Sequence, residues 1–320
     1  MVKIALAGGS GDVASEILDV LVAAKKHEIV VLSRSAKPKR EPPTGVTLVT
    51  VDYDNVESLV HALKGVHTLL SFVGEVQDPT SSVQRKLIDA AVQAGVRRFA
   101  PSEWGTSKME HLDWYAFKGA TREYLKEINN DKKVLEYTLF QAGLFLNYLT
   151  YPHNSAKHLH QMDMPLNLND RRFIMLEGGD DSRVNFVTVQ DLAHIVAKAV
   201  DYEGEWPIEG GVRGTEITMG ELLALSKKVR GGTFDVTKLQ RSDILAGEWK
   251  ASWVPVIDHP AMKALGKEAL DAMSKHITGR VLLAMEAGGY VVNDNWNRLI
   301  PEYQFTKLEP FLTEAWRGKP

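Results

Sequence analysis

A glycine-rich turn near the start of the chain has the composition of a phosphate-binding loop. It follows a short apolar run, Val2 to Ala7, and an apolar-periodic segment that contains Ile17 and Leu21 comes after it. A glycine string alone is also compatible with an ordinary turn. A strand before it and a helix N-terminus after it, however, are the context that holds a pyrophosphate. We therefore predict a dinucleotide site formed by Gly8, Gly9, Ser10, Gly11, Asp12 and Val13.

The end of the second predicted strand, residues 27–32, indicates which dinucleotide is bound. Sites for NAD carry an acidic residue here, which accepts a hydrogen bond from the ribose 2′-hydroxyl. This chain carries Arg34 instead, a cation suited to a 2′-phosphate, with Ser33 and Ser35 beside it. The cations that follow, Lys37, Lys39 and Arg40, are also compatible with a solvated basic loop. We predict that NADP(H) is the cofactor and that Ser33 and Arg34 contact it.

Composition limits the classes of function. The 320 residues carry a net charge of −3 with both signs mixed, which gives no electrostatic case for nucleic acid or an anionic membrane as partner. There is no cysteine, so disulfides, thiolate metal sites and a cysteine nucleophile are excluded. No apolar run approaches the ~20 residues that span a bilayer. We expect a soluble, cytoplasmic protein whose partner is a small-molecule substrate.

The first half of the chain alternates between strand and helix patterns. This spacing predicts an α/β fold of the Rossmann type, a doubly wound parallel sheet with its ligands at the carboxyl ends of the strands. Asn55 is a candidate helix cap. The further strands are predicted at residues 46–51, 67–73, 96–100 and 135–141, and the helices at 56–63, 81–94 and 117–128.

The regular alternation stops near Gly143. We predict an NADP-binding domain over residues 1–147 and a smaller C-terminal substrate-binding region over 148–320, with an approximate boundary. Strands between Phe173 and Val187 are compatible with rejoining the main sheet. Thr188 is a predicted cap for a helix over 189–200, and Thr218 with Glu221 fits a capping box. A strand is expected at 234–239 and a helix-rich stretch at 259–285.

Three motifs of the first half resemble one known family. They are Thr68-Leu-Leu-Ser-Phe-Val-Gly74, Gln84-Arg-Lys-Leu-Ile-Asp-Ala-Ala91 and Ala94-Gly-Val-Arg-Arg-Phe-Ala-Pro-Ser-Glu-Trp-Gly105. Together they resemble the signature of the NmrA-like, isoflavone-reductase-like atypical short-chain dehydrogenases. The resemblance covers the nucleotide-binding half and thins after about Asn147. It implies a dinucleotide-binding protein without specifying a substrate.

The reductases of this family carry a Lys-x-x-x-Arg pattern on a helix shortly after the last of these motifs, matched here by Lys118 and Arg122. The resemblance implies that Lys118 is the general acid/base and contacts the nicotinamide ribose. Arg122, one helical turn on, would then lie by the substrate. The positive charge of an oxidised nicotinamide favours the neutral amine, which is consistent with proton transfer. The alternative is a surface lysine on an amphipathic helix.

Other residues of the site are implied by the same resemblance. Phe72, Val73 and Gly74 lie where the family backbone passes along the cofactor, and Phe145 is the ring expected to cover the nicotinamide. Tyr115 precedes Lys118 by three residues, whereas the main short-chain dehydrogenase branch has a tyrosine four residues before its lysine. Tyr115 is therefore expected to contact the substrate as a pocket wall, and a supporting role for its hydroxyl stays open. Trp104 is also expected to contact the substrate. Glu103 is either a second acid or a residue that ties down a loop.

Two further groups of residues suggest chemistry less strongly. His153, His158 and His160 cluster with only Asp163 as a nearby carboxylate and lack helical spacing, so we predict a polar loop and no metal site. The tryptophans at 249, 253, 296 and 316 fit a core or a lid. Trp249 and Trp253, near Pro255 and His259, are also compatible with the wall of an aromatic substrate site.

The leading hypothesis is an NADPH-dependent reductase of a hydrophobic, aromatic or polycyclic small molecule, with Lys118 handling the proton. An NADP-binding redox sensor of the NmrA type is the second, although such relatives generally lack the lysine. An NADP-bound cyclase or isomerase that uses no redox step is the third. The sequence does not separate the first from the third, since both keep the cofactor site. A monomer or a homodimer fits each of them.

Overall fold

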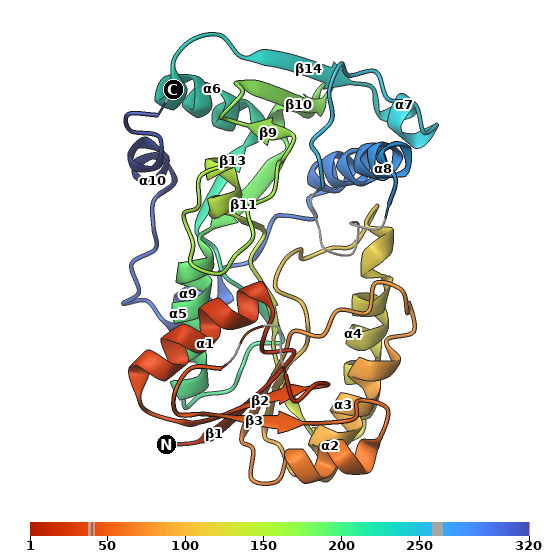
Figure 1. The fold of residues 1–320 in the computed structure, drawn as a ribbon, viewed down its shortest axis with the longest axis vertical. Coiled ribbons are helices and arrows are strands. Elements are labelled where there is room, and N and C mark those ends of the chain that lie inside the picture. Colours follow the sequence, from red (N-terminus) through yellow and green to blue (C-terminus); the bar gives the residue numbers. More distant parts are fainter. Residues whose placement is uncertain (38–39, 41, 258–264, 320) are drawn as a thin grey trace.

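A six-stranded parallel sheet organises the N-terminal half of the chain (Figure 1). The computed structural model describes residues 1–37, 40, 42–257 and 265–319. The strand order is β3-β2-β1-β4-β5-β6, so the direction of winding reverses between β1 and β4. In open sheets of this kind the ligand crevice lies at that reversal. The strands are β1 (Lys3–Ala7), β2 (Glu28–Ser33), β3 (Val46–Thr50), β4 (Thr68–Ser71), β5 (Arg98–Ala100) and β6 (Glu136–Tyr137).

Helices cover both faces of this sheet, as its apolar strands require. On one face α1 (Asp12–Ala24) packs against α5 (Val189–Asp201), where Ile17 and Leu21 join Leu192 in one buried cluster. On the other face α2 (Val56–Ala62) packs against α3 (Ser82–Gln93), and α3 packs against α4 (Ala116–Ile128). The predicted α/β Rossmann-type fold is therefore confirmed.

The strand predicted over residues 135–141 is divided into two. Its first part, β6, joins the main sheet, whereas β7 (Leu139–Gln141) pairs with β12 (Glu209–Gly211). Thr138 marks the change: its amide donates to Phe99, and its hydroxyl donates to the carbonyl of Pro207 at 2.6 Å. The apolar pattern alone did not reveal that the chain changes partners at this residue.

Residues beyond 147 contribute to both parts of the molecule. In addition to the pair β12-β7, two three-stranded sheets are separate from the main one, with the orders β14-β10-β9 and β13-β11-β8. The strands between Phe173 and Val187 lie in these small sheets and do not rejoin the six-stranded sheet. Their members are β8 (Leu144–Phe145), β9 (Leu166–Asn167), β10 (Arg172–Leu176), β11 (Arg183–Val187), β13 (Thr215–Thr218) and β14 (Asp235–Leu239). Helix α5, in contrast, completes the N-terminal layer.

The C-terminal helices, except the one at Asn295–Leu299, lie in the upper part of the molecule in Figure 1. The predicted caps are present: the Thr188 side chain accepts from the Asp191 amide, and Thr218 with Glu221 forms a capping box. Within the described ranges, none of the helices combines the length and apolar composition that crossing a bilayer requires. These helices are α6 (Met219–Arg230), α7 (Arg241–Leu245), α8 (Lys267–Glu286), α9 (Asn295–Leu299) and α10 (Leu308–Ala315).

Candidate active site

The glycine-rich turn connects β1 to α1 at the carboxyl edge of the sheet. Gly8 has a φ of +73°, and a Cβ there would lie 3.2 Å from the backbone of Phe72. Gly9 faces the sheet instead, because a Cβ would lie 2.9 Å from Val31. At Gly11 the nearest atom to such a Cβ is a carbonyl oxygen 3.4 Å away, and the residue is exposed. The turn therefore leaves open space at Gly11, next to the N-terminus of α1, where a phosphate fits.

Arg34 and Ser33 stand at the end of β2, where the sequence places them. Arg34 is exposed and has no ion-pair partner among the residues that the structure describes. The Ser33 hydroxyl donates to the carbonyl of Ser35 and accepts from its amide, so it shapes the bend after the strand. Arg34 is available to a phosphate, and Ser33 orients the backbone that carries it.

Arg40 is held against α1 and is not a solvated loop residue. Its guanidinium donates to Asp12 at 3.0 Å, to the Ser15 hydroxyl at 3.2 Å and to the His158 carbonyl at 3.3 Å. A cavity of about 50 Å³ remains between it and the glycine turn. Asp12, predicted to contact cofactor, is thus engaged by Arg40 and by the amide of His160. Lys37 is exposed, and Lys39 lies outside the described residues.

The end of β4 brings Phe72, Val73 and Gly74 to the same edge, since Ala7 of β1 lies opposite Ser71. Phe72 stacks on Trp104 at 4.5 Å between ring centroids, and Trp104 stacks on Phe140 at 5.4 Å. The indole N–H of Trp104 donates to the Ser71 carbonyl. Trp104 is 9% exposed, so it lies inside this aromatic stack, at the carboxyl edge of the sheet.

Two residues that the sequence analysis passed over fix this strand end. The Gln84 side chain donates to the Val73 carbonyl at 2.8 Å and to the Ser71 hydroxyl at 2.9 Å. The buried carboxylate of Glu75 accepts from the amides of Val83 and Gln84 at the start of α3. Gln84 is the first residue of one of the motifs quoted above, and this position is the signal by which the sequence could have identified it.

Lys118 is buried at the start of α4. Its ammonium donates to the backbone carbonyl of Glu103 at 2.6 Å and lies 3.6 Å from the centroid of the Tyr115 ring. No carboxylate lies within ion-pair distance of it among the described residues. Since Glu103 follows β5, whose Ala100 lies opposite Leu70 of β4, the amine stands at the carboxyl edge of the sheet. Tyr115 therefore contacts the lysine.

Arg122 lies one turn further along α4 and is occupied by protein groups. It donates to both carboxylate oxygens of Glu103, at 2.8 and 2.6 Å, and to the carbonyls of Ser107 and Thr106. Burial would lower the pKa of Arg122, but the bond and the charge of Glu103 raise it, with a net increase. Of the two roles considered for Glu103, the contacts match the one that ties down a loop. Arg122 holds the loop 103–107, which carries the acceptor of Lys118.

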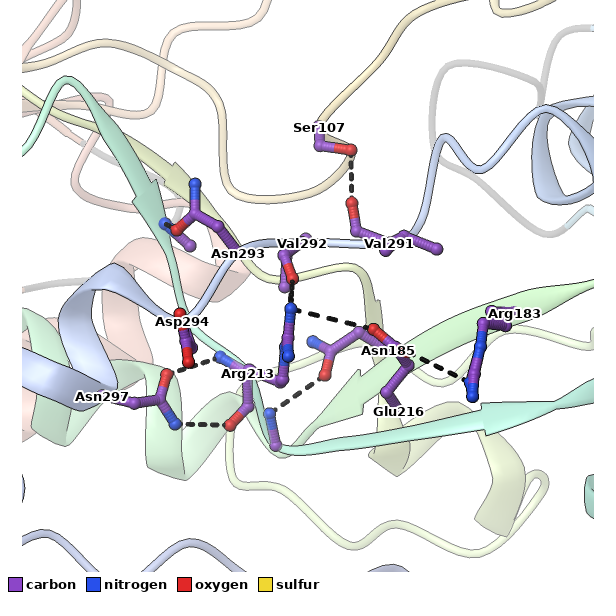
Figure 2. A network of polar contacts seen from close by, with 12 residues as sticks. Ser107, Arg183, Asn185, Arg213, Glu216, Val291, Val292, Asn293, Asp294 and Asn297 are labelled. Atoms are coloured by element: carbon purple, nitrogen blue, oxygen red, sulfur yellow. Dashed lines mark hydrogen bonds and ion pairs between the residues drawn. The ribbon is translucent and has the colours of Figure 1, made fainter.

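A polar network fastens the same loop from the other side (Figure 2). The Ser107 hydroxyl donates to the Val291 carbonyl at 2.5 Å, and its amide donates to Gly289. Arg213 donates to the carbonyl of Val292, and its backbone pairs with the Asn297 amide group. The loop after β5 is therefore clamped between Arg122 and the segment that follows α8.

Phe145 and the 3₁₀ helix after it, η2 (Leu146–Thr150), close the site from the C-terminal side. Phe145 is buried and meets Tyr148 edge to face, with 5.8 Å between centroids. Burial raises the pKa of Tyr148, and the neighbouring Tyr115 and Asp12 add to the increase. Burial likewise raises the pKa of Tyr290. Tyr148 therefore carries a neutral hydroxyl beside Phe145, and the sequence analysis missed it because this tyrosine occurs in an apolar run.

The clustered histidines contact neighbouring parts of the fold. His158 contacts Asp19 at 2.9 Å, and its amide donates to the buried carboxylate of Glu16. Burial alone would raise the pKa of Asp19, but bonds from Lys157 and His158 lower it overall. His153 meets the Trp316 ring. The described part of the chain holds no group of three or more metal-binding side chains.

The four tryptophans singled out in the sequence differ in burial and in the residues that they contact. Trp296 is buried in the aromatic stack beyond Phe140, and Trp316 in the core below α10. Trp249 and Trp253 are half-buried and lie between α7 and α8 in the chain, with the Trp249 N–H donating to the Trp253 carbonyl. His259 lies outside the described residues.

Comparison with known proteins identifies the family to which this chain is similar. The model of the NmrA-like family matches residues 2–251. An oxidoreductase of Botryotinia fuckeliana is 37% identical over 172 residues, which are 52% of this chain and 57% of that protein. The chain thus spans little more than half the length of that relative. The oxidoreductase swnN of Metarhizium robertsii is 26% identical over 100% of this chain and 98% of its own length.

A solved structure has the same fold at low sequence identity. The protein AtPrR2, determined with NADP⁺ and (+)-pinoresinol, has a TM-score of 0.68 and 20% identity, and the match covers 98% of both chains. This likeness establishes the fold. The family match confirms the resemblance drawn from the three motifs.

Proposed function

We propose a reductase activity for this chain, which belongs to the NmrA-like family. The cofactor is NADPH and the substrate a hydrophobic aromatic or polycyclic small molecule. The names of the two relatives, both oxidoreductases, support the enzyme class, and the NADP⁺ and pinoresinol bound by AtPrR2 support the cofactor and the kind of substrate.

The residues at the sheet edge fit the cofactor. The open space at Gly11 and the free N–H groups at the start of α1 suit a pyrophosphate, and the exposed guanidinium of Arg34 suits a 2′-phosphate. Phe72, Val73 and Gly74 would line its ribose side, and Phe145 its ring. The bound NADPH supplies a hydride to the substrate. Arg40, which pairs with Asp12 beside the same turn, would be a second cation near the cofactor.

One observation carries the mechanism: Lys118 is a buried amine without a carboxylate partner in the described ranges, held at the ligand edge by a backbone carbonyl and an aromatic ring. An ammonium tied to a carboxylate is less free to donate its proton. Lys118 instead presents donors at the edge, where an oxyanion formed by hydride addition would need one. The loop that holds it is fixed by Arg122, Glu103 and Ser107, so the amine is preorganised.

The test is turnover of NADPH against aromatic enones, imines and quinones. Lys118→Met should lower kcat by ~10²–10⁴-fold, while the variant still binds NADPH. Lys118→Arg should rescue poorly, since a guanidinium does not exchange a proton at working pH. Lys126→Met, which removes an exposed lysine from the same helix, is the matched control.

Near-wild-type turnover by Lys118→Met would refute the role of the lysine. NADPH binding without turnover of any compound would favour the redox-sensor hypothesis. Conversion of a substrate with no net oxidation of NADPH would favour the non-redox isomerase.

A further inference from the structure

A second cavity, of about 300 Å³, lies between α7 and α8. Its α8 wall is formed by Asp271, Lys275, His276 and Arg280. Residues three and four apart share a helix face, so Asp271 and Lys275 lie in line with Thr278 and Leu282, which are buried in the core further along α8. The volume of the cavity is at the lower end of the range for small-molecule sites, ~300–1,000 Å³.

Arg280 is the cation of this cavity whose carboxylate partner is most distant. The carboxylate of Asp271 pairs with Lys275 at 2.6 Å, whereas Lys250 lies 3.2 Å from Glu248 and 2.9 Å from Asp243. Arg280 and His276 both approach the same oxygen of Asp113, each at 3.8 Å. That separation is too long for a hydrogen bond, and no other partner of Arg280 is found among the described residues. The guanidinium donors of Arg280 are therefore free to receive an anion.

The other wall is aromatic and apolar. It includes Ile244, Leu245 and Trp249. The bond from the Trp249 N–H to the Trp253 carbonyl, 3.0 Å long, fixes the plane of the indole. Leu245 is 51% exposed, so this wall presents apolar surface to solvent. A flat ring against the indole would cover these surfaces.

We propose that this cavity is a second ligand site, which binds a small planar aromatic carboxylate. The ring lies against Trp249, and the carboxylate accepts hydrogen bonds from Arg280, with His276 beside it. The chemistry of the two walls, one aromatic and one cationic, selects this class over neutral aromatics and over inorganic anions. The proposal goes beyond the proposed reductase activity and does not depend on it.

Asp113 would compete with a bound carboxylate for Arg280 and His276. Asp113 is the first residue of the 3₁₀ helix η1 (Asp113–Tyr115), which leads directly into α4. A bound carboxylate would replace Asp113 as the partner of Arg280 and His276. Removing the charge of Asp113 should therefore strengthen binding, whereas removing the charge of Arg280 should weaken it.

The experiment is calorimetric titration with 2-naphthoate, with naphthalene-2-methanol as the neutral analogue. Wild-type protein should bind the carboxylate and not the alcohol. Arg280→Met should weaken binding by about tenfold or more, and Asp113→Asn should strengthen it by roughly two- to fivefold. Arg241→Met, which removes a neighbouring arginine paired with Glu286 outside the cavity, is the matched control and should change nothing.

Each titration is repeated with saturating NADP⁺. Equal affinity with and without NADP⁺ supports a site separate from the cofactor groove, and this result is readable even if the protein has no reductase activity. Absence of naphthoate binding, equal binding of the alcohol, or displacement by NADP⁺ would overturn the proposal. If Arg280→Met does not fold, the gain expected from Asp113→Asn still decides the question.

Discussion

The ammonium nitrogen of Lys118 lies 3.6 Å from the centre of the Tyr115 ring, so the two side chains form a cation–π pair at the start of α4. The same nitrogen donates to the Glu103 carbonyl. Two contacts of different kinds thus fix the direction in which the amine points. The spacing of three residues, which differs from that of the main dehydrogenase branch, is what places the ring under the amine.

This pair gives the first prediction. Tyr115→Phe keeps the ring and should retain most of the turnover, whereas Tyr115→Leu removes it. A cation–π contact is worth ~0.5–2 kcal/mol, so the leucine variant should lose roughly 2- to 30-fold in kcat with little change in the Kd for NADPH. Steady-state kinetics with a substrate from the screen provides the measurement. If the phenylalanine variant loses as much as the leucine variant, the hydroxyl acts in the reaction and the ring contact is secondary.

Arg34 should set the preference for NADP(H) over NAD(H). Losing its contact with a 2′-phosphate removes a charge-assisted bond worth ~1.5–3 kcal/mol, or about 10- to 100-fold in affinity. Arg34→Asp should therefore narrow or reverse the preference when both Kd values are measured by calorimetry. Lys37→Asp makes the same charge change in the same exposed loop and should have a much smaller effect. Equal Kd values for the two cofactors in the wild type would contradict this prediction.

Gly11→Val should abolish cofactor binding and leave the fold intact. The backbone of Gly11 has a φ of −70°, which valine adopts, and a Cβ there meets only one carbonyl oxygen, at 3.4 Å. The side chain would instead fill the space for the phosphate. Calorimetry with NADPH and circular dichroism separate the two effects. Retained affinity would mean that the phosphates bind elsewhere.

Arg122→Met should act on stability, which changes the expectation drawn from the sequence. It leaves the buried carboxylate of Glu103 without its partner, and breaking a buried ion pair costs ~3–5 kcal/mol. The loss should appear in urea unfolding, and the double variant Arg122→Met with Glu103→Gln should recover part of it. Unchanged stability with a raised KM would instead restore a direct contact between Arg122 and the substrate.

Much of the fold could be predicted because its signals are local. The glycine turn, the capping threonines Thr188 and Thr218, and the spacing of the first strands each depend on neighbouring residues. The division of the strand at Thr138 depends on β12, some seventy residues later, so no local pattern could reveal it. The same holds for the small sheets around Phe173 and Val187, whose pairing partners are distant in sequence.

The candidate site divides in the same way. Helical spacing placed Lys118 and Arg122 on one face, and both do reach the loop after β5. What each side chain binds there depends on tertiary contacts: Glu103 forms an ion pair with Arg122, and Arg40 forms one with Asp12. Gln84 and Tyr148 escaped notice because a helical glutamine and a tyrosine in an apolar run look structural.

The packing of α5 on α1 has a consequence for how the protein is made. The apolar side chains of α1, among them Ile17 and Leu21, are covered by Leu192 and its neighbours, which are synthesised much later. During synthesis the apolar side of α1 therefore stays uncovered until residue 201 has emerged from the ribosome. We expect chaperones that bind nascent chains to engage this segment, and a polypeptide that ends at residue 147 should aggregate.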